Sequence, residues 1–193
     1  KLILWAWAAM RVLDHLRTLP EIDHRRIAVA GHSRMGKAAL LASGLDPRFF
    51  AVLANEPGCM GGALTRGKTG ETLEDICDSF PYFFAPRLRD YVGREAALPF
   101  DQHFLLALNA PRKLYVASAA QDFWADPISE FLGCAAASCA WEQLGAPGLL
   151  GADRLPRPGT VLSGGMIGYH LREGEHYLSR YEWQRFLDFL EEA

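Results

Sequence analysis

The sequence predicts an α/β fold in which a mostly parallel sheet is flanked by helices. Short apolar runs rich in Val, Ile and Ala alternate along the chain with segments of helical periodicity. That alternation is typical of parallel strands joined by helices that cover both faces of the sheet. The chain has 193 residues and is 50% hydrophobic, which is enough for one sizeable core. We therefore expect a single domain over residues 1–193.

The first part of the chain begins with an amphipathic pattern, because Leu2, Trp5 and Leu13 fall on one helical face. Gly44 closes a later helical pattern, as glycine commonly does at helix ends. In order, we expect a helix at 1–18, a strand at 26–30, a turn at 31–36, a helix at 37–44 and a second apolar strand at 49–55.

The second part of the chain is less regular at its start. Residues 63–100 hold only short helical pieces, and the last segment has Ser179 as an expected N-cap with Glu182 three residues on. In order, we then expect a helix at 103–109, a strand at 113–119, a helix at 127–144, a Gly/Pro-rich loop at 145–159, a weak strand at 160–162 and a closing helix from 179 onward.

Composition excludes several functional classes. The net charge is −3 and no basic face stands out, so we expect no nucleic-acid partner. No apolar run reaches the roughly 18 residues of a membrane helix, and the four cysteines fit no zinc motif. We therefore expect no membrane contact, no metal and no cofactor. Because Lys1 already lies inside a helical pattern, we also expect that an N-terminal part of this domain precedes it.

Residues 31–40, GHSRMGKAAL, lie between a predicted strand and a predicted helix. A glycine-flanked serine at such a sharp turn is typical of the nucleophile elbow of serine hydrolases. The first glycine of the G-x-S-x-G pattern is present at Gly31, whereas the second comes one position late at Gly36. The stretch therefore predicts Ser33 as a nucleophile, with an ordinary strand-to-helix loop as the alternative.

The order of polar residues after later strands supports a catalytic triad. Hydrolases of this kind follow the chain order serine, acid, histidine. Asp122 follows the third predicted strand, and His176 precedes the last helix. Glu56, which follows the second strand, is another candidate acid. A serine hydroxyl needs a base, and the base needs an oriented tautomer. The residues leave the choice between Asp122 and Glu56 open, with Asp122 ahead on loop position.

Several segments, in the same order, resemble the glucuronoyl esterases of carbohydrate esterase family 15. They are GHSRMGKAAL, GETLEDI, FPYFF, LPFDQHFLLALNAPRKLYVASA, DFWADP, IGYH and EHYLSRYEWQRFLDFL. The resemblance implies the C-terminal portion of an α/β-hydrolase fold. It also implies a secreted or periplasmic serine esterase that cleaves esters between (4-O-methyl-)glucuronic acid of xylan and lignin alcohols. We expect it to act as a monomer.

The resemblance also implies roles for individual residues. Ser33 matches the nucleophile and His176 the base, while the family's acid follows either of two strands, here at Glu56 and Asp122. Arg34 matches an arginine that helps to hold the oxyanion. Sugar-binding positions are matched by Lys37, Glu71 and Trp124, of which Lys37 and Glu71 would bind hydroxyls and Trp124 would pack near the ring.

Some of these residues have structural alternatives. Trp124 could belong to the core, and Glu71 could favour a helix start. Asp126 is expected to be a helix N-cap, and His170 a pocket-lining or strand-end residue. The aromatic cluster at 80–84 is assigned to the core.

Two other functions compete with the glucuronoyl esterase hypothesis. A different carbohydrate or aryl esterase, such as an acetyl-xylan esterase, would keep the triad without needing Lys37, Glu71 and Trp124. An inactive carbohydrate-binding relative would not need the intact set of serine, acid and histidine. We also expect residues 1–193 to be poorly soluble or inactive on their own, because an incomplete sheet leaves an unpaired edge.

Overall fold

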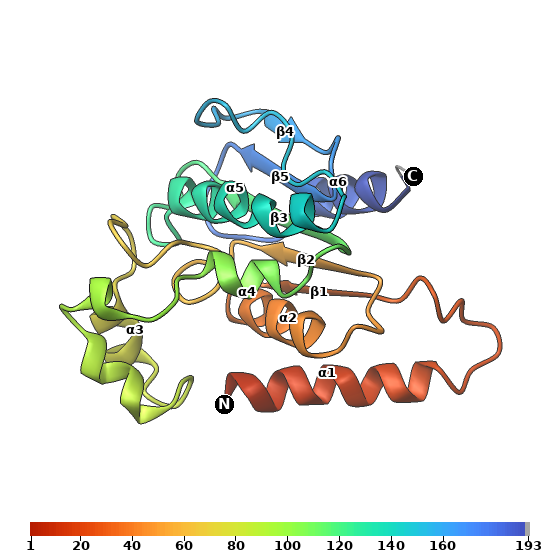
Figure 1. Ribbon diagram of the computed structural model, residues 1–193, viewed down its shortest axis with the longest axis horizontal. Helices are drawn as coiled ribbons and strands as arrows, with labels where there is room; N and C mark the ends of the chain where they lie inside the picture. The colour runs from red at the N-terminus through yellow and green to blue at the C-terminus, as the bar shows by residue number, and fades with distance from the viewer. Residues whose placement is uncertain (192–193) are drawn as a thin grey trace.

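A computed structural model describes residues 1–191. Its centre is a five-stranded sheet in the order β1-β2-β3-β5-β4 (Figure 1). Four strands run parallel, and β4 pairs antiparallel with β5 at one edge. The strands are β1 (Ala28–His32), β2 (Ala51–Asn55), β3 (Lys113–Ala119), β4 (Thr160–Leu162) and β5 (Ile167–Arg172).

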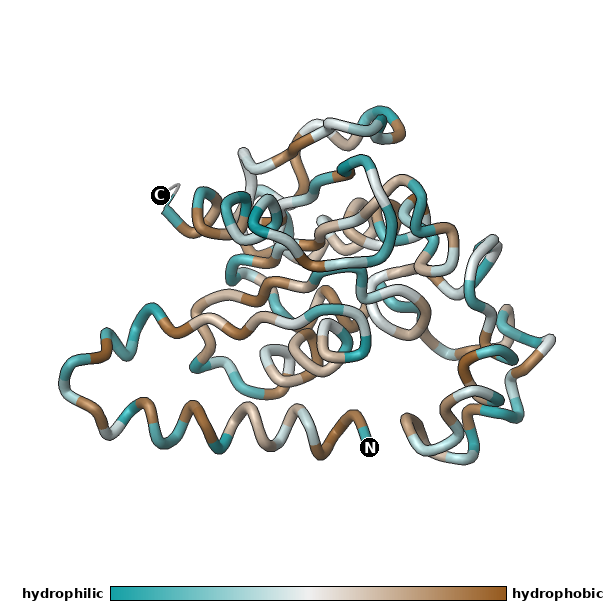
Figure 2. Tube along the Cα trace, turned by 180° about the vertical axis from the view of Figure 1, so that it is seen from behind, coloured by the Kyte–Doolittle hydropathy of each residue, from teal (hydrophilic) through white to brown (hydrophobic). Residues whose placement is uncertain are grey.

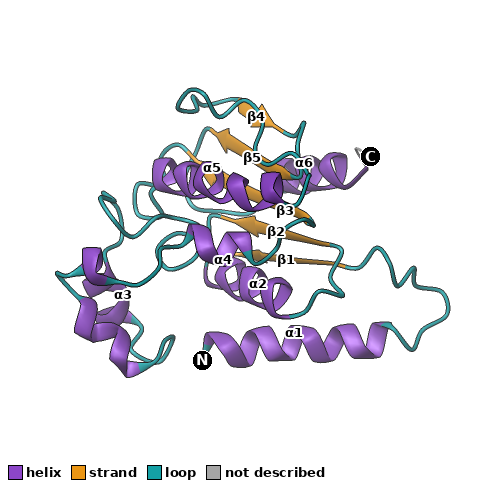
Figure 3. Cartoon of the chain, in the orientation of Figure 1, coloured by secondary structure: helices purple, strands orange, loops and turns teal. Residues whose placement is uncertain are grey.

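Helices connect the strands and cover both faces of the sheet (Figure 3). The connection from β2 to β3 is long and holds α3, two short 3₁₀ helices and α4. The helices are α1 (Leu2–Leu16), α2 (Arg34–Leu45), α3 (Leu73–Ser79), η1 (Pro86–Tyr91), η2 (Glu95–Ala97), α4 (His103–Ala107), α5 (Pro127–Gln143) and α6 (Arg180–Glu191).

Alternation along the strands divides the core into two layers. Val52 and Val116 belong to the larger cluster, which includes residues of α2, α4 and α5. Leu53 and Tyr115 point to the other face, where Phe186 of α6 packs against them. Successive side chains of a strand point to opposite faces, so apolar residues at every position predict burial on both sides. β2, β3 and β5 are accordingly buried along their full length.

The first helix packs beside the sheet, against α2. Ala6 and Leu13 of α1 are fully buried in a cluster with Ala42 of α2 and Phe49. Hydrophobic and hydrophilic segments alternate along α1 (Figure 2). Of the residues predicted to share one apolar face, Leu2 and Leu13 are buried, whereas Trp5 is only half-buried.

The prediction of alternating strands and helices is confirmed, with differences at the boundaries. β1 continues through Gly31 and His32, so the turn is tighter than expected and α2 begins at Arg34. β5 was missed altogether, because it carries His170 and Arg172 in a stretch that lacks a clean apolar run. Among the described residues, no helix is both long and apolar enough to cross a bilayer.

The parallel strands bring four loops to one edge of the sheet. His32, Asn55, Ala117 and His170 lie side by side in register across β1, β2, β3 and β5. The residues that follow each of these positions therefore emerge at the carboxyl ends of the strands, where ligands bind in open α/β sheets. All four candidate triad residues lie in these loops.

Candidate active site

Ser33 occupies a strained turn between β1 and α2. Its φ of 57° and ψ of −124° are unusual for a residue with a side chain. The turn can be this tight because residue 31 is glycine. A Cβ at this position would lie 2.1 Å from the carbonyl oxygen of Met35. The Ser33 backbone N–H donates to the Asn55 carbonyl at 2.8 Å, which fixes the turn against β2. This geometry is that of a nucleophile elbow, with Ser33 directly before the first turn of a helix.

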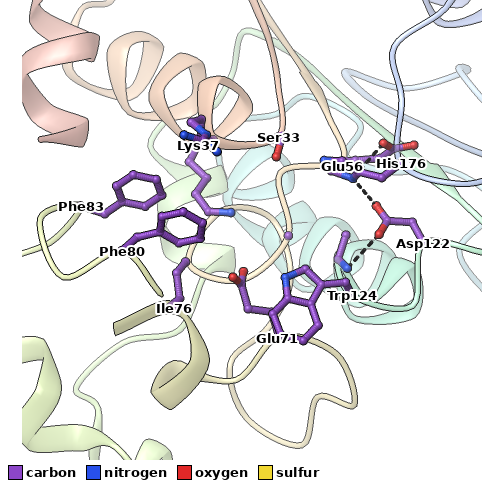
Figure 4. A pocket seen from close by; sticks show the side chains of 13 residues that line it. Ser33, Lys37, Glu56, Glu71, Ile76, Phe80, Phe83, Asp122, Trp124 and His176 are labelled. Carbon is purple, nitrogen blue, oxygen red and sulfur yellow. Dashed lines mark hydrogen bonds and ion pairs between the residues drawn. The ribbon is translucent and has the colours of Figure 1, made fainter. Parts of the chain in front are cut away.

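His176 lies beside both predicted acids (Figure 4). Its Nδ1 is 2.6 Å from Asp122 Oδ2 and 3.2 Å from Glu56 Oε2. Asp122 is nearly buried, and its other oxygen accepts a hydrogen bond from the Ala125 backbone N–H at 3.2 Å. With Nδ1 donating to a carboxylate, Nε2 carries the lone pair that a general base needs.

The two acids have different surroundings. Glu56 is 1% exposed, and its Oε1 accepts a hydrogen bond of 2.6 Å from Arg172. Burial raises the pKa of Glu56 to about 9, although the Arg172 charge opposes that shift. A carboxyl group that is protonated at neutral pH offers His176 no negative charge. The shorter distance and this pKa both favour Asp122 as the partner of His176.

A cavity of about 250 Å³ opens beside these residues and is lined by both polar and aromatic side chains. Ser33 and His176 lie at one side, and Lys37 and Glu71 at the other (Figure 4). Its lining consists of Ser33, Arg34, Lys37, Glu56, Gly58, Glu71, Ile76, Phe80, Phe83, Asp122, Trp124, Ala125 and His176. All eight predicted site residues are therefore brought together.

Lys37 and Glu71 place opposite charges in the wall of this cavity. Lys37 is 6% exposed and its Nζ donates to the Pro57 carbonyl at 2.6 Å. Burial lowers the pKa of Lys37, while Glu71 opposes this shift. Burial likewise raises the pKa of Glu71, which Lys37 and a hydrogen bond from the Trp124 side chain oppose. Buried groups of this kind are hydrogen-bond partners suited to a polar ligand.

Trp124 and Arg34 lie at the open side of the cavity. Trp124 is 57% exposed, so its assignment to the core is excluded. The Arg34 guanidinium lies over the rings of Phe80 and Phe83, at 5.4 Å and 5.8 Å from their centroids. These contacts hold the arginine near Ser33 by cation–π attraction. The assignment of the aromatic cluster to the core is therefore incomplete, because Phe80 and Phe83 also line the cavity.

Other predicted residues have structural roles. Asp126 caps α5 by accepting from the Ser129 backbone N–H, as expected. His170 is fully buried in β5, where its Nδ1 is 3.0 Å from the Tyr115 hydroxyl. Burial lowers the pKa of His170 to about 4. Glu71 precedes α3, whose N-cap is Thr72.

One group of side chains resembles a metal site. Possible ligand atoms of His32, Glu56 and His176 lie within 4.8 Å of one another. One ring nitrogen of each histidine is already engaged, because His32 Nδ1 is 2.8 Å from Asn55 Nδ2 and His176 Nδ1 faces Asp122. The His32 ring also packs on that of His176, with 4.5 Å between centroids. These contacts fix the orientation of both imidazole rings.

Sequence reasoning missed two parts of this site. Phe80 and Phe83 belong to the FPYFF segment, which the sequence assigns to the core, and only the fold shows that they line the cavity with Ser33. Arg172 was missed because its strand was missed. An arginine five residues before Tyr177, in LREGEHY, gave no signal of its contact with Glu56.

Comparison with known proteins supports this description. A family model described as glucuronyl esterase, fungi, matches residues 1–145. A carbohydrate esterase from an unknown prokaryotic organism is 42% identical over 96% of this chain and 42% of its own length. A 4-O-methyl-glucuronoyl methylesterase from Hypocrea jecorina is 36% identical over 78% of this chain and 35% of its own. The chain thus spans less than half the length of these relatives.

Solved structures extend the likeness to the fold. A glucuronoyl esterase from Solibacter usitatus superimposes with a TM-score of 0.92 and 40% identity, covering 98% of this chain and 48% of its own. The α/β-hydrolase fold that the sequence predicts is thereby confirmed. Since the family model spans most of the sequence and the solved relative matches nearly all of it in space, this chain belongs to the glucuronoyl esterase family, carbohydrate esterase family 15.

Proposed function

We propose that this protein is a serine esterase that hydrolyses esters of glucuronic acid. The observation that supports this proposal most strongly is the shared cavity. The serine at the strained turn, the histidine paired with Asp122, and the buried Lys37 and Glu71 all line one cavity. The first two supply the chemistry of ester cleavage, and the third supplies partners for a polar sugar. We further propose that residues 1–193 belong to a single catalytic domain.

The first half-reaction forms an acyl-enzyme. Ser33 Oγ attacks the ester carbonyl while His176 Nε2 takes its proton, and Asp122 stabilises the imidazolium that results. The carbonyl oxygen gains negative charge beside the start of α2. There the Arg34 backbone N–H and guanidinium act as oxyanion donors, the second of them charged. His176 then returns the proton to the departing alcohol.

The second half-reaction releases the acid. Water takes the place of the alcohol, His176 removes its proton, and the tetrahedral intermediate forms and collapses with Ser33 as the leaving group. The products are free glucuronic acid and the regenerated enzyme. Every proton in this cycle passes through His176, so the proposed chemistry needs no second acid or base.

The sugar would lie in the part of the cavity away from His176. Lys37 and Glu71 would bind its hydroxyl groups, and Trp124, which is exposed at the rim, would pack near the ring. The similarity to the 4-O-methyl-glucuronoyl methylesterase of Hypocrea jecorina supports a (4-O-methyl-)glucuronoyl ester as the substrate class. We propose a glucuronoxylan–lignin ester as the natural substrate, an exported protein, and action as a monomer.

Hydrolysis of benzyl glucuronate by the full-length protein tests the proposal, with Ser33→Ala and an acetyl ester as controls. We expect turnover of the glucuronate that Ser33→Ala abolishes, and little turnover of the acetyl ester. Preference for the acetyl ester would keep the triad but remove the sugar-binding roles, which is the first alternative. Binding of glucuronate without hydrolysis would identify an inactive carbohydrate-binding relative.

A further inference from the structure

The loop that carries His176 wraps around one buried arginine. Arg172 ends β5 and is 6% exposed. Its guanidinium donates to the backbone carbonyls of Glu173 at 2.9 Å, Glu175 at 3.0 Å and Tyr177 at 2.7 Å. Because Glu175 and Tyr177 are the two neighbours of His176 in the chain, one side chain holds the backbone on both sides of it.

The same guanidinium ties this loop to the rest of the site. It donates to Glu56 Oε1 at 2.6 Å and, through Nε, to Glu182 Oε1. The other oxygen of Glu182 accepts from the backbone N–H and the hydroxyl of Ser179, each at 2.6 Å. The loop is thus fastened to β2 at one end and to the start of α6 at the other. Only the five-donor fork of arginine reaches so many acceptors at once.

The packing of Tyr177 completes the enclosure of the guanidinium. The Tyr177 ring covers its face, with 3.7 Å from the Arg172 Cζ to the ring centroid. Gly174 makes this possible, since its φ is +103° and a Cβ there would lie 2.7 Å from the Tyr177 hydroxyl. The backbone of the loop and the Tyr177 ring therefore enclose the Arg172 guanidinium, while the His176 side chain points away from it, toward the cavity.

We propose that Arg172 is a positioning residue for His176, which sets the loop so that Nδ1 meets Asp122 and Nε2 faces Ser33. This inference rests on the proposed function of His176 as the base. A displacement of about 1 Å in catalytic geometry costs on the order of a hundredfold in rate. Loss of the carbonyl contacts should therefore lower the rate of the chemical step more than the affinity for the sugar.

The test compares Arg172→Lys with Arg112→Lys in the full-length protein. Arg112 also binds backbone carbonyls, those of Ser43, Phe49 and Leu108, but at the opposite end of the sheet. We expect Arg172→Lys to lower kcat about 10- to 100-fold with KM changed less than about threefold. We expect Arg112→Lys to lower the melting temperature without changing kcat. Equal kcat values in the two variants would overturn the proposal.

Arg172→Lys also removes hydrogen bonds to the buried carboxyl groups of Glu56 and Glu182. A second pair of variants leaves those hydrogen bonds in place. Tyr177 is 45% exposed, so its replacement leaves the core intact. Tyr177→Ala uncovers Arg172, whereas Tyr177→Phe keeps the ring over it. We expect a kcat about 3- to 10-fold lower for the alanine variant than for the phenylalanine variant. Identical kcat values for this pair would also count against the proposal.

A readout independent of the sugar separates this inference from the proposed substrate. The rate at which a fluorophosphonate labels Ser33 reports how well His176 activates it, whatever ester is the substrate. Slower labelling of Arg172→Lys than of Arg112→Lys supports the positioning role, even if benzyl glucuronate is not hydrolysed. Equal labelling rates overturn it, and absence of labelling in the unaltered protein overturns both the catalytic proposal and this one.

Discussion

Replacing each of the two acids beside His176 is the most direct test of how this site works. Asp122→Asn removes the carboxylate 2.6 Å from Nδ1, and Glu56→Gln changes the one at 3.2 Å. On distance alone both losses would be large. We expect them to differ greatly, because burial raises the pKa of Glu56 to about 9, so that this carboxyl group is neutral at pH 7.

The magnitude follows from the charge on each group. Two unit charges about 4 Å apart interact by about 4 kcal/mol at an effective dielectric constant of about 20. Losing that stabilisation of the imidazolium in the transition state lowers kcat by about 10³-fold. Glu56, whose pKa burial raises to about 9, is protonated at pH 7. Its replacement by neutral glutamine removes no charge there, so the loss of kcat should stay under about tenfold.

The pH dependence of the Asp122→Asn variant sharpens this prediction. The charge of Asp122 is one of the effects that raise the pKa of Glu56. Without it, Glu56 ionises at a pH below about 9 and becomes a negative neighbour of His176. The residual kcat of Asp122→Asn should therefore rise as pH increases from 7 to 9, and the double variant with Glu56→Gln should show no such rise.

The assay is steady-state hydrolysis of benzyl glucuronate, with spontaneous hydrolysis subtracted at each pH. Circular dichroism and the melting temperature show whether each variant is folded. A larger loss of kcat in Glu56→Gln than in Asp122→Asn would refute the reasoning, and would make Glu56 the working acid.

Three further predictions concern the turn, the core and the sugar site. Gly31→Ala should lower the free energy of unfolding by about 1–3 kcal/mol, because its Cβ would meet a backbone oxygen at 2.1 Å. Gly164→Ala, whose nearest neighbour would be at 3.8 Å, should change little in the same urea titration. Burial raises the pKa of Glu130 to about 8, so the folded protein keeps a proton that the unfolded chain releases near 4.5. Stability should fall by about 1.4 kcal/mol per pH unit between about pH 5 and 8 through this residue, and denaturation curves of Glu130→Gln should lack that contribution. Lys37→Met should lower kcat/KM for benzyl glucuronate about 10- to 100-fold and leave an acetyl ester nearly unchanged, since it removes a charged hydrogen-bond donor to the sugar.

Much of the fold could be predicted because local pattern and burial agree. β2 and β3 are apolar at nearly every position and buried on both faces, which is what a run of Val, Ala and Leu indicates. β5 is equally buried but contains His170 and Arg172, and both His170 Nδ1 and the Arg172 guanidinium find their partners only in the folded protein. A strand whose polar residues are satisfied by distant neighbours has no local signal.

The sequence predicts most of the residues that form the site, but not the role that each of them has. Ser33, Asp122 and His176 each follow or precede a recognisable element, and chain order is enough to bring them together at one edge of the sheet. Phe80 and Phe83 reach the cavity from the long connection between β2 and β3, where periodicity is weak. Their position depends on how that connection folds back over α2.

The choice between Glu56 and Asp122 shows why the role of a site residue is harder to predict than its presence in the site. Glu56 has a cation against it, and an arginine beside a carboxyl group ordinarily lowers its pKa. Here burial outweighs the arginine, so the pKa rises. Removing Arg172 would therefore make Glu56 still less acidic and would not free it to act as the acid. The arginine contributes to the site mainly through the carbonyls it binds around His176, and those contacts exist only once β5, its loop and α6 have come together.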